Sequence, residues 1–152
     1  LAALAQGIAV AAQPGNLLFV YFGYTHCPDI CPTTFAYLQL ALEDIGPLAG
    51  RVSTVFVTAD PARDSAAVLD SYVGSFVSRY SVVRIEDPTL LAAIEAPFQA
   101  SSTIGPVEAD GSYDVSHTAL VYAVDSAGKV QVEWPFGTPA ESFAHDLELL
   151  LQ

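Results

Sequence analysis

Three short apolar runs restrict the folds open to this chain more than any other feature of its sequence. They lie at Leu17–Phe22, Val52–Thr58 and Thr118–Val124, and they are rich in β-branched and aromatic residues. Runs of this length and composition predict buried strands. Because buried strands of this kind need helices packed over the sheet, the three runs indicate an α/β fold.

Segments with helical periodicity alternate with these strands. The spacing of apolar residues predicts helices over Pro32–Asp44, Ser65–Phe76, Thr89–Gln99 and Ala140–Leu151. Asp64 and Ser65 are both suitable caps for the second helix. Pro97 lies inside the third helix and is expected to disturb its end.

The remaining strands set the topology. Ser81–Ile85 is typical of a short strand, and Val130–Trp134 follows the third apolar run after a turn at Asp125–Gly128. A further segment, Val107–Val115, carries Asp110-Gly111 at its centre, which is a hairpin turn signal. Early βα units require parallel neighbours, whereas the final hairpin adds an antiparallel edge. We therefore expect a central mixed β-sheet flanked by helices on both faces.

The composition limits the size of the domain and its partners. The chain has 152 residues, 52% hydrophobic and 14% charged, so we expect a single domain over residues 1–152 with a substantial core. A formal net charge of −12 argues against nucleic acid as a partner and is compatible with a cationic partner or metal. No segment is long enough to span a membrane. Because the chain begins without Met, we expect a soluble fragment of a protein whose N-terminal anchor lies upstream.

The segment richest in reactive side chains is Gly23–Pro32, between the first strand and the first helix. In open α/β sheets, this carboxyl edge is where sites are built. Pro32 suits the first helical position, and a residue before proline is biased away from helical backbone, so Cys31 is expected at the helix entrance. A thiol there feels the positive end of the helix dipole, which favours thiolate.

Cys27 and Cys31 are the two cysteines of the chain, and three residues separate them. That spacing can bring the sulfurs close enough for a disulfide or for chelation of one soft cation. Spacing alone does not decide between redox and metal chemistry, although the thioredoxin-type redox motif has two intervening residues. Since the chain has no Met, any copper site must use thiolate and imidazole.

Histidine is the natural third ligand, because two thiolates leave a first-row metal short of ligands. His26 adjoins Cys27 and should project away from the same metal, while His145 lies on the polar side of the last helix. His117 precedes the third apolar run, so it can enter the sheet beside the Cys loop. The alternative is that His117 bonds to the backbone and binds no metal.

Four segments of the chain resemble the Sco (SCO1/SenC) family. The most specific is Tyr21–Thr34 (YFGYTHCPDICPTT), and the others are Thr58–Asp64 (TADPARD), Val115–Thr118 (VSHT) and Trp134–Pro139 (WPFGTP). The resemblance extends from Asn16 to the end of the chain. Residues 1–15 do not resemble the hairpin that usually precedes the first strand, and Ala59 stands where the family usually has Val.

The resemblance implies a thioredoxin-like fold and a copper site formed by Cys27, Cys31 and His117. Members are copper chaperones in cytochrome c oxidase assembly, and they bind Cu(I) and in many cases Cu(II). They deliver copper to the CuA centre of oxidase subunit II, or they reduce its cysteines with the pair Cys27 and Cys31. A separate copper donor protein is a further expected partner. Most members are membrane-anchored and face the periplasm or the mitochondrial intermembrane space.

Three further residues are candidates for a role around the site. Asp60 follows the second strand, on the same edge as the Cys loop, so it can orient His117, cap the next turn or pair with Arg63. Asp29 lies between the cysteines and can tune the thiols or meet a partner. Tyr24 can contribute to an apolar rim for docking or pack in the core.

Other functions fit the sequence less well. Redox thioredoxins carry a cis-proline opposite their cysteines, whereas the corresponding neighbourhood here, Val115–Thr118, has none, which favours a metal ligand. A peroxidase related to peroxiredoxins needs a lone low-pKa cysteine with Thr and Arg neighbours, and Cys31 supplies little of that. A structural zinc site normally has four ligands, and no good fourth is evident. A thiol–disulfide oxidoreductase stays the main alternative, because the same thiolates serve both tasks.

Overall fold

The computed structural model describes residues 11–28 and 30–152. Residues 1–10 and Asp29 lie outside the described part, so the interpretations of Asp29 and of the start of the chain stay predictions. The described elements, in chain order, are β1 (Leu17–Gly23), α2 (Ile30–Asp44), η1 (Gly46–Arg51), β2 (Val52–Thr58), α3 (Ala66–Gly74), β3 (Tyr80–Val83), α4 (Pro88–Glu95), η2 (Ala96–Phe98), β4 (Ser102–Ile104), β5 (Val115–His117), β6 (Leu120–Val124), β7 (Val130–Pro135) and α5 (Ala140–Leu150).

One mixed sheet forms the centre of the molecule. Its strand order is β3-β2-β1-β6-β7, with β1, β2 and β3 parallel to one another. β6 runs antiparallel to both β1 and β7. The three apolar runs of the sequence occupy the three inner strands, which confirms the expected mixed α/β architecture. The carboxyl end of the central strand, β1, leads directly into the loop that carries Cys27.

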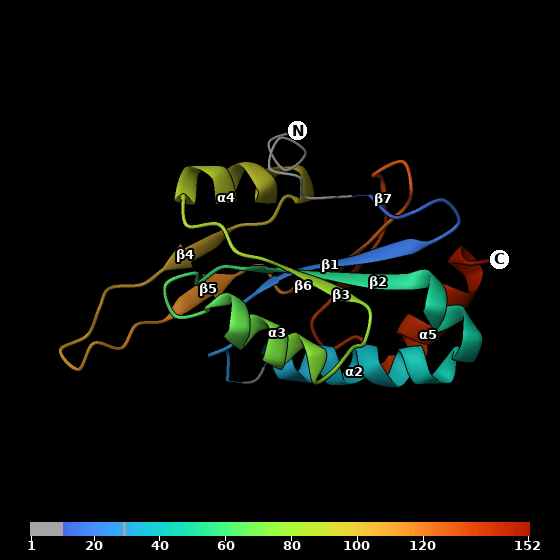
Figure 1. Cartoon of the computed structure of the whole chain (residues 1–152), viewed down its shortest axis with the longest axis horizontal. Helices are drawn as coiled ribbons and strands as arrows, with labels where there is room; N and C mark the ends of the chain where they lie inside the picture. Colours follow the sequence, from blue (N-terminus) through green and yellow to red (C-terminus); the bar gives the residue numbers. More distant parts are fainter. Residues whose placement is uncertain (1–10, 29) are drawn as a thin grey trace.

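Alternate residues of β1 face two separate layers of helices (Figure 1). Phe19 and Tyr21 belong to a core shared with α2, α3 and α5, whereas Val20 and Phe22 belong to a core shared with α4. All seven residues of β1 are buried. Burial of each such large apolar side chain contributes about 1.5–3 kcal/mol, so β1 is a firmly anchored base for the loop that follows it.

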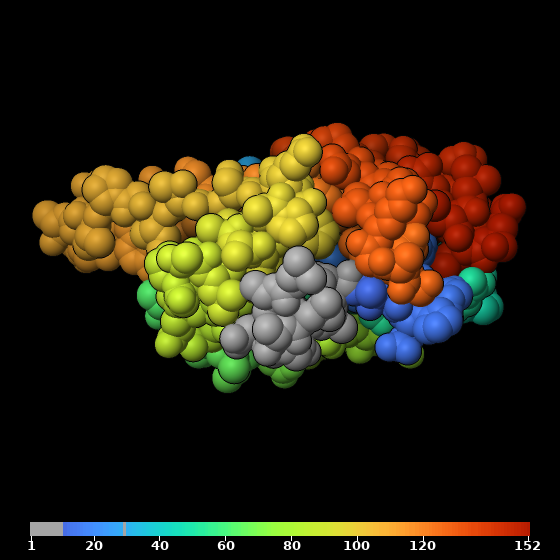
Figure 2. Space-filling view, turned by 90° about the horizontal axis from the view of Figure 1, so that it is seen from above, coloured from blue at the N-terminus to red at the C-terminus, as the bar shows by residue number. Residues whose placement is uncertain are grey.

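A second, two-stranded sheet lies apart from the first. β4 and β5 pair antiparallel, with Ser102 opposite His117. The chain between them projects from the body of the molecule, as Figure 2 shows for the orange-brown segment at one end. The predicted turn at Asp110-Gly111 is present, with Gly111 at φ +85°. β4 ends before the segment Val107–Val115, and β5 begins at its last residue, so this segment connects the two strands of the hairpin.

The helices differ from the prediction at their ends. α2 begins at Ile30, so Cys31 lies inside its first turn and not before it. Pro32 permits this early start, because its missing amide is among those that have no partner within a helix. Ser65, and not Asp64, caps α3 by accepting a hydrogen bond from the amide of Val68.

The third predicted helix stops earlier than expected. α4 ends at Glu95, and the chain continues as the short 3-10 turn η2, which contains Pro97. None of the helices within residues 11–28 and 30–152 is both long enough and apolar enough to cross a membrane.

Candidate metal centre

The loop after β1 holds both cysteines near the end of the central strand. Cys27 lies in this loop, and Cys31 lies in the first turn of α2. Gly23, the last residue of β1, allows the sulfur of Cys31 to approach the strand closely. A Cβ at this position would lie 2.9 Å from Cys31 Sγ and 2.7 Å from the ring of Tyr21. Glycine therefore allows the sulfur to pack directly against the strand.

Three potential metal ligands converge at this point. The sulfurs of Cys27 and Cys31 and one ring nitrogen of His117 all lie within 4.8 Å of one another. The distance from Cys31 Sγ to His117 Nε2 is 3.6 Å. Two atoms that each lie about 2.0–2.3 Å from one ion cannot be more than roughly 4.6 Å apart, so this triangle nearly matches the size of a single-ion site. The prediction that these three residues lie together agrees with the structure.

His117 reaches the cysteines from outside the central sheet. It is the last residue of β5, whereas β6 begins only at Leu120, so it does not enter a central strand as expected. Its Nδ1 lies 3.2 Å from the carbonyl oxygen of Thr118. A hydrogen bond donated by Nδ1 leaves Nε2 with a free lone pair toward the sulfurs, which is the arrangement that metal-binding histidines use.

The two thiols occupy different electrostatic environments. A hydrogen bond from Cys31 lowers the pKa of Cys27 to about 4, against the opposing effect of burial, and the nearby His117 adds to the lowering. The hydrogen bond to Cys27, together with burial, raises the pKa of Cys31. The amide of Cys31, at the start of α2, also donates to Cys27 Sγ at 3.4 Å.

Sequence reasoning placed the thiolate on the wrong cysteine. It expected the helix start to favour thiolate at Cys31, but Cys31 is inside the helix with a side chain that is fully buried. The sulfur that faces the amino end of α2 is that of Cys27. The positive end of the helix dipole favours thiolate, but it acts on Cys27 rather than on Cys31.

Two tyrosines line the site. Tyr21 donates a hydrogen bond from its hydroxyl to Cys31 Sγ at 3.4 Å, a contact that the sequence did not reveal. Tyr24, considered as a docking residue, is buried, and its ring meets the ring of His117 edge-on at 5.6 Å. Tyr24 therefore packs in the core beside the histidine rather than standing at the surface.

Asp64 holds the Cys loop, although sequence reasoning considered it only as a helix cap. Its carboxylate is completely buried and accepts hydrogen bonds from the Thr25 amide at 3.0 Å and from the Thr58 hydroxyl at 2.7 Å. The Thr25 hydroxyl donates to it as well. The signal that could have revealed this role is its place after β2, on the same edge as the Cys loop.

Asp60 is buried beside the site but contacts neither cysteine nor His117 through a hydrogen bond. It pairs with Arg63, which was one of the expected arrangements, and it accepts a hydrogen bond from the Tyr113 hydroxyl at 2.6 Å. Asp29, the other acidic candidate, is outside the described residues.

The other two histidines lie away from the sulfurs, as predicted. His26 is exposed, with its Nδ1 3.8 Å from Asp64 Oδ1, and His145 is exposed on α5. Across residues 11–28 and 30–152, no fourth histidine, cysteine or carboxylate joins the group of three.

The site opens into a pocket of about 400 Å³. Its lining comprises Tyr24, Cys27, Pro28, Ile30, Val115, Ser116 and His117. Cys27 and His117 are thus accessible to a metal or to a partner, whereas Cys31 forms the floor of the site behind them.

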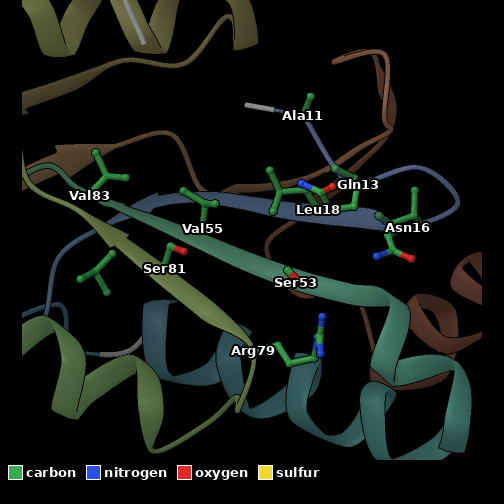
Figure 3. Close-up of a pocket in the computed structure, with 12 residues that line it drawn as sticks. Ala11, Gln13, Asn16, Leu18, Ser53, Val55, Arg79, Ser81 and Val83 are labelled. Carbon is green, nitrogen blue, oxygen red and sulfur yellow. The ribbon is translucent and has the colours of Figure 1, made fainter. Parts of the chain in front are cut away.

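A second pocket, of similar size, lies at the amino ends of β1, β2 and β3 (Figure 3). Arg79 is its charged lining residue, and its lining includes no cysteine, histidine or carboxylate. This second pocket therefore offers no soft metal ligand, whereas the pocket at the carboxyl end of β1 is lined by Cys27 and His117.

Comparison with known proteins places these features in a family. The family described as SCO1/SenC matches residues 6–152. A protein named "Protein SCO2 homolog, mitochondrial" from Danio rerio is 33% identical over 116 residues, which are 75% of this chain and 41% of that protein. The chain spans between 41% and 57% of the lengths of the curated relatives it matches.

Solved structures give the same result. The copper-bound structure of Bradyrhizobium japonicum ScoI is 31% identical, with a TM-score of 0.77 over 90% of this chain and 86% of that one. The copper-bound structure of yeast Sco1 is 27% identical, also with a TM-score of 0.77, over 90% of this chain and 76% of that one. The expected thioredoxin-like fold is confirmed.

Proposed function

The chain belongs to the SCO1/SenC family, and from that premise we propose that it is a copper-binding protein of cytochrome c oxidase assembly. Its proposed ligands are Cys27, Cys31 and His117. The observation that carries the proposal is the approach of two sulfurs and one imidazole nitrogen to within 4.8 Å of one another. Thiolate and imidazole are the ligands that copper favours. The copper-bound relatives from Bradyrhizobium japonicum and yeast support copper as the metal.

Both oxidation states of copper fit the proposed site. Two thiolates suffice for Cu(I), so Cys27 and Cys31 carry the affinity for it. Cu(II) prefers additional nitrogen ligands, and the orientation of His117 Nε2 toward Cys31 supports its role in that state. The lowered pKa of Cys27 supports metal capture, because the thiolate needed for binding is available without raising the pH.

The proposed acceptor is the CuA centre of cytochrome c oxidase subunit II, with a second copper-binding protein as donor. The pocket beside Cys27 and His117 supports transfer, since a partner's ligands can reach the metal from that side. We also propose that the domain faces the periplasm or the mitochondrial intermembrane space and is held there by an anchor in the full-length protein. The mitochondrial relatives support the second of these locations.

Copper uptake by the reduced protein in competition with a Cu(I) chelator tests this function. We expect one Cu(I) per chain for the wild type and a loss of at least about 100-fold in affinity for Cys27→Ala or Cys31→Ala, because one thiolate replaces two. His145→Ala is the matched control, since His145 is an exposed histidine far from the sulfurs, and it should bind as the wild type does. Reduced wild type that takes up no copper would overturn the proposal.

A second candidate function is reduction of the CuA cysteines before copper enters. The unequal thiols favour it: Cys27 has a lowered pKa and borders the pocket, and Cys31 lies behind it. The Cys27 thiolate attacks the partner's disulfide and releases one partner thiolate. Cys31 then attacks Cys27 Sγ, loses its proton to solvent, releases the second partner thiol and leaves a Cys27–Cys31 disulfide, so two electrons pass to the partner.

His117→Ala separates the two functions. Thiol–disulfide exchange takes place between sulfurs, and the hydrogen bond from Cys31 lowers the pKa of Cys27 more than His117 does, so this variant should reduce an oxidised CuA domain at close to the wild-type rate while binding Cu(II) poorly. If its rate of reduction equals that of the wild type, the reductase function is supported. If Cys27→Ser retains full reductase activity, that function is excluded.

A further inference from the structure

His117 is the only one of the three proposed ligands that is carried by neither the central sheet nor a helix or loop next to it in the chain. Both cysteines sit between β1 and α2, which belong to the central sheet and its helix layer. His117 is carried by β5, whose one strand partner among the described residues is β4. Figure 2 shows how far the chain that joins these two strands extends away from the core. The position of the imidazole therefore depends on what ties this hairpin down.

Tyr113, two residues before β5, provides such a tie. Its hydroxyl donates a hydrogen bond of 2.6 Å to Asp60 Oδ1. The guanidinium of Arg63 lies over its ring, with the guanidinium carbon 3.9 Å from the ring centre. Arg63 also pairs with the other carboxylate oxygen of Asp60. We refer to Asp60, Arg63 and Tyr113 together as the Tyr113 latch.

The latch joins the hairpin to the segment that also holds the Cys loop. Asp60 is fully buried just after β2, and its amide donates to the Thr58 hydroxyl at 3.0 Å. Asp64 donates its amide to the Asp60 carbonyl at 3.0 Å and uses its own carboxylate to hold Thr25. One short segment, Asp60–Asp64, thus anchors both halves of the site, the thiols through Asp64 and the histidine through Asp60.

Resting on the copper-binding function proposed above, we propose that Tyr113 is a positioning residue that sets whether His117 is available to the metal. With the latch closed, the imidazole stands beside the two sulfurs and the site offers three ligands. With the latch open, the hairpin can move while the cysteines stay in place, and the site offers two thiolates. The closed state favours binding of Cu(II), whereas the open state still binds Cu(I) but has lost the ligand that Cu(II) needs.

The variant Tyr113→Phe tests the latch, because it removes the hydroxyl and keeps the ring over Arg63. We expect Cu(II) affinity to fall by roughly tenfold, a loss commonly carried by one hydrogen bond to a buried charged group. The visible thiolate charge-transfer band of Cu(II) should shift or weaken, and Cu(I) affinity should stay within about twofold of the wild type. Tyr80→Phe is the control for loss of a tyrosine hydroxyl, since Tyr80 donates a hydrogen bond of 2.7 Å to the exposed Asp70 and is not part of the site.

Hydrogen exchange of the metal-free protein supplies a readout that does not depend on copper. In Tyr113→Phe, the amides of the β4–β5 hairpin, including that of Gly105, which bonds to the Asp114 carbonyl, should exchange faster while those of β1 do not. Wild-type Cu(II) affinity, spectrum and exchange in this variant would overturn the latch and leave the copper site itself intact. A wild type that binds no copper would overturn the function on which the latch rests.

Discussion

The two cysteines are chemically unequal although they share one site. Cys27 borders the pocket. Its sulfur accepts hydrogen bonds from the thiol and from the backbone amide of Cys31, and these stabilise the Cys27 thiolate. Cys31 is fully buried, accepts a hydrogen bond from Tyr21 and keeps its proton in the metal-free protein. The Cys27 sulfur is therefore the one that a reagent from solvent reaches first.

Alkylation of the reduced, metal-free protein measures this asymmetry. Because the pKa of Cys27 is lowered to about 4, its reaction rate with iodoacetamide should stay nearly constant from pH 8 down to pH 6 and fall only as the pH approaches 4. An ordinary thiol loses roughly tenfold in rate per unit below its pKa of about 8.5. Mass spectrometry should locate the label on Cys27.

Cys27→Ala provides the control for this experiment, because only Cys31 then remains and it should react slowly throughout. Labelling of Cys31 before Cys27 in the wild type, or an alkylation rate that falls tenfold per pH unit below pH 8, would contradict a lowered pKa at Cys27.

At the residue scale, the sequence predicted which three residues lie together better than it predicted the contacts that support them. The two cysteines stood out through local spacing, and His117 through the family resemblance. Asp64 was missed as a support because its partners, Thr25 and Thr58, come from other elements, and one is 39 positions away. Hydrogen bonds between distant residues leave no pattern in a single sequence, so such contacts require the fold.

At the scale of elements, the junction between β1 and its loop decides the geometry of the thiols. Gly23 ends the strand where the Tyr21 ring and the Cys31 sulfur leave no room for a Cβ. Because β1 is buried along its whole length, the strand cannot shift to make room for a larger residue.

Gly23→Ala should therefore destabilise the metal-free protein by about 1–3 kcal/mol, the usual range for an overpacked core, since the new Cβ would lie under 3.0 Å from two side chains. Urea unfolding measures the change. Gly50→Ala is the matched control, because a Cβ there meets nothing within 4 Å, and it should alter the free energy of unfolding by less than about 0.5 kcal/mol. Equal stability of Gly23→Ala and the wild type would show that the junction tolerates a side chain.

The elements were predicted well where burial alone determines them and less well elsewhere. β2 was predicted residue for residue, because its sequence is dense in β-branched and aromatic residues and nearly all of it is buried. The turn of the β4–β5 hairpin was predicted but its paired residues were not, since its strands are three residues long and, within the described part of the chain, pair with each other alone. For such strands, a turn signal locates the bend but not the paired residues.

At the scale of the whole molecule, the topology brings the site together from distant parts of the chain. Cys31 and His117 are 86 positions apart, and the antiparallel pairing of β6 with β1 returns the chain to the carboxyl end of β1 just where β5 ends. The mixed sheet was predictable from the order of elements. The strand order, and with it the approach of His117, was not, because several arrangements satisfy the same hydrophobic pattern.

The net charge also acts over the whole molecule. Between Arg84 and Lys129 the chain has no Lys or Arg, and this stretch includes the hairpin that carries His117. A formal charge of −12 attracts cations to the surface and disfavours polyanionic partners. This field suits the proposed capture of a metal cation.

Titration of the reduced protein with Cu(II), followed by visible absorption for the wild type beside His117→Ala, tests the central claim most directly. The wild type should bind one Cu(II) per chain and show thiolate charge-transfer absorption, because two sulfurs and a nitrogen of His117 lie within 4.8 Å of one another, close enough to hold one ion. His117→Ala should lose this spectrum while still binding Cu(I). A wild type without the absorption band, or a variant whose stoichiometry and spectrum match the wild type, would contradict a three-ligand copper site.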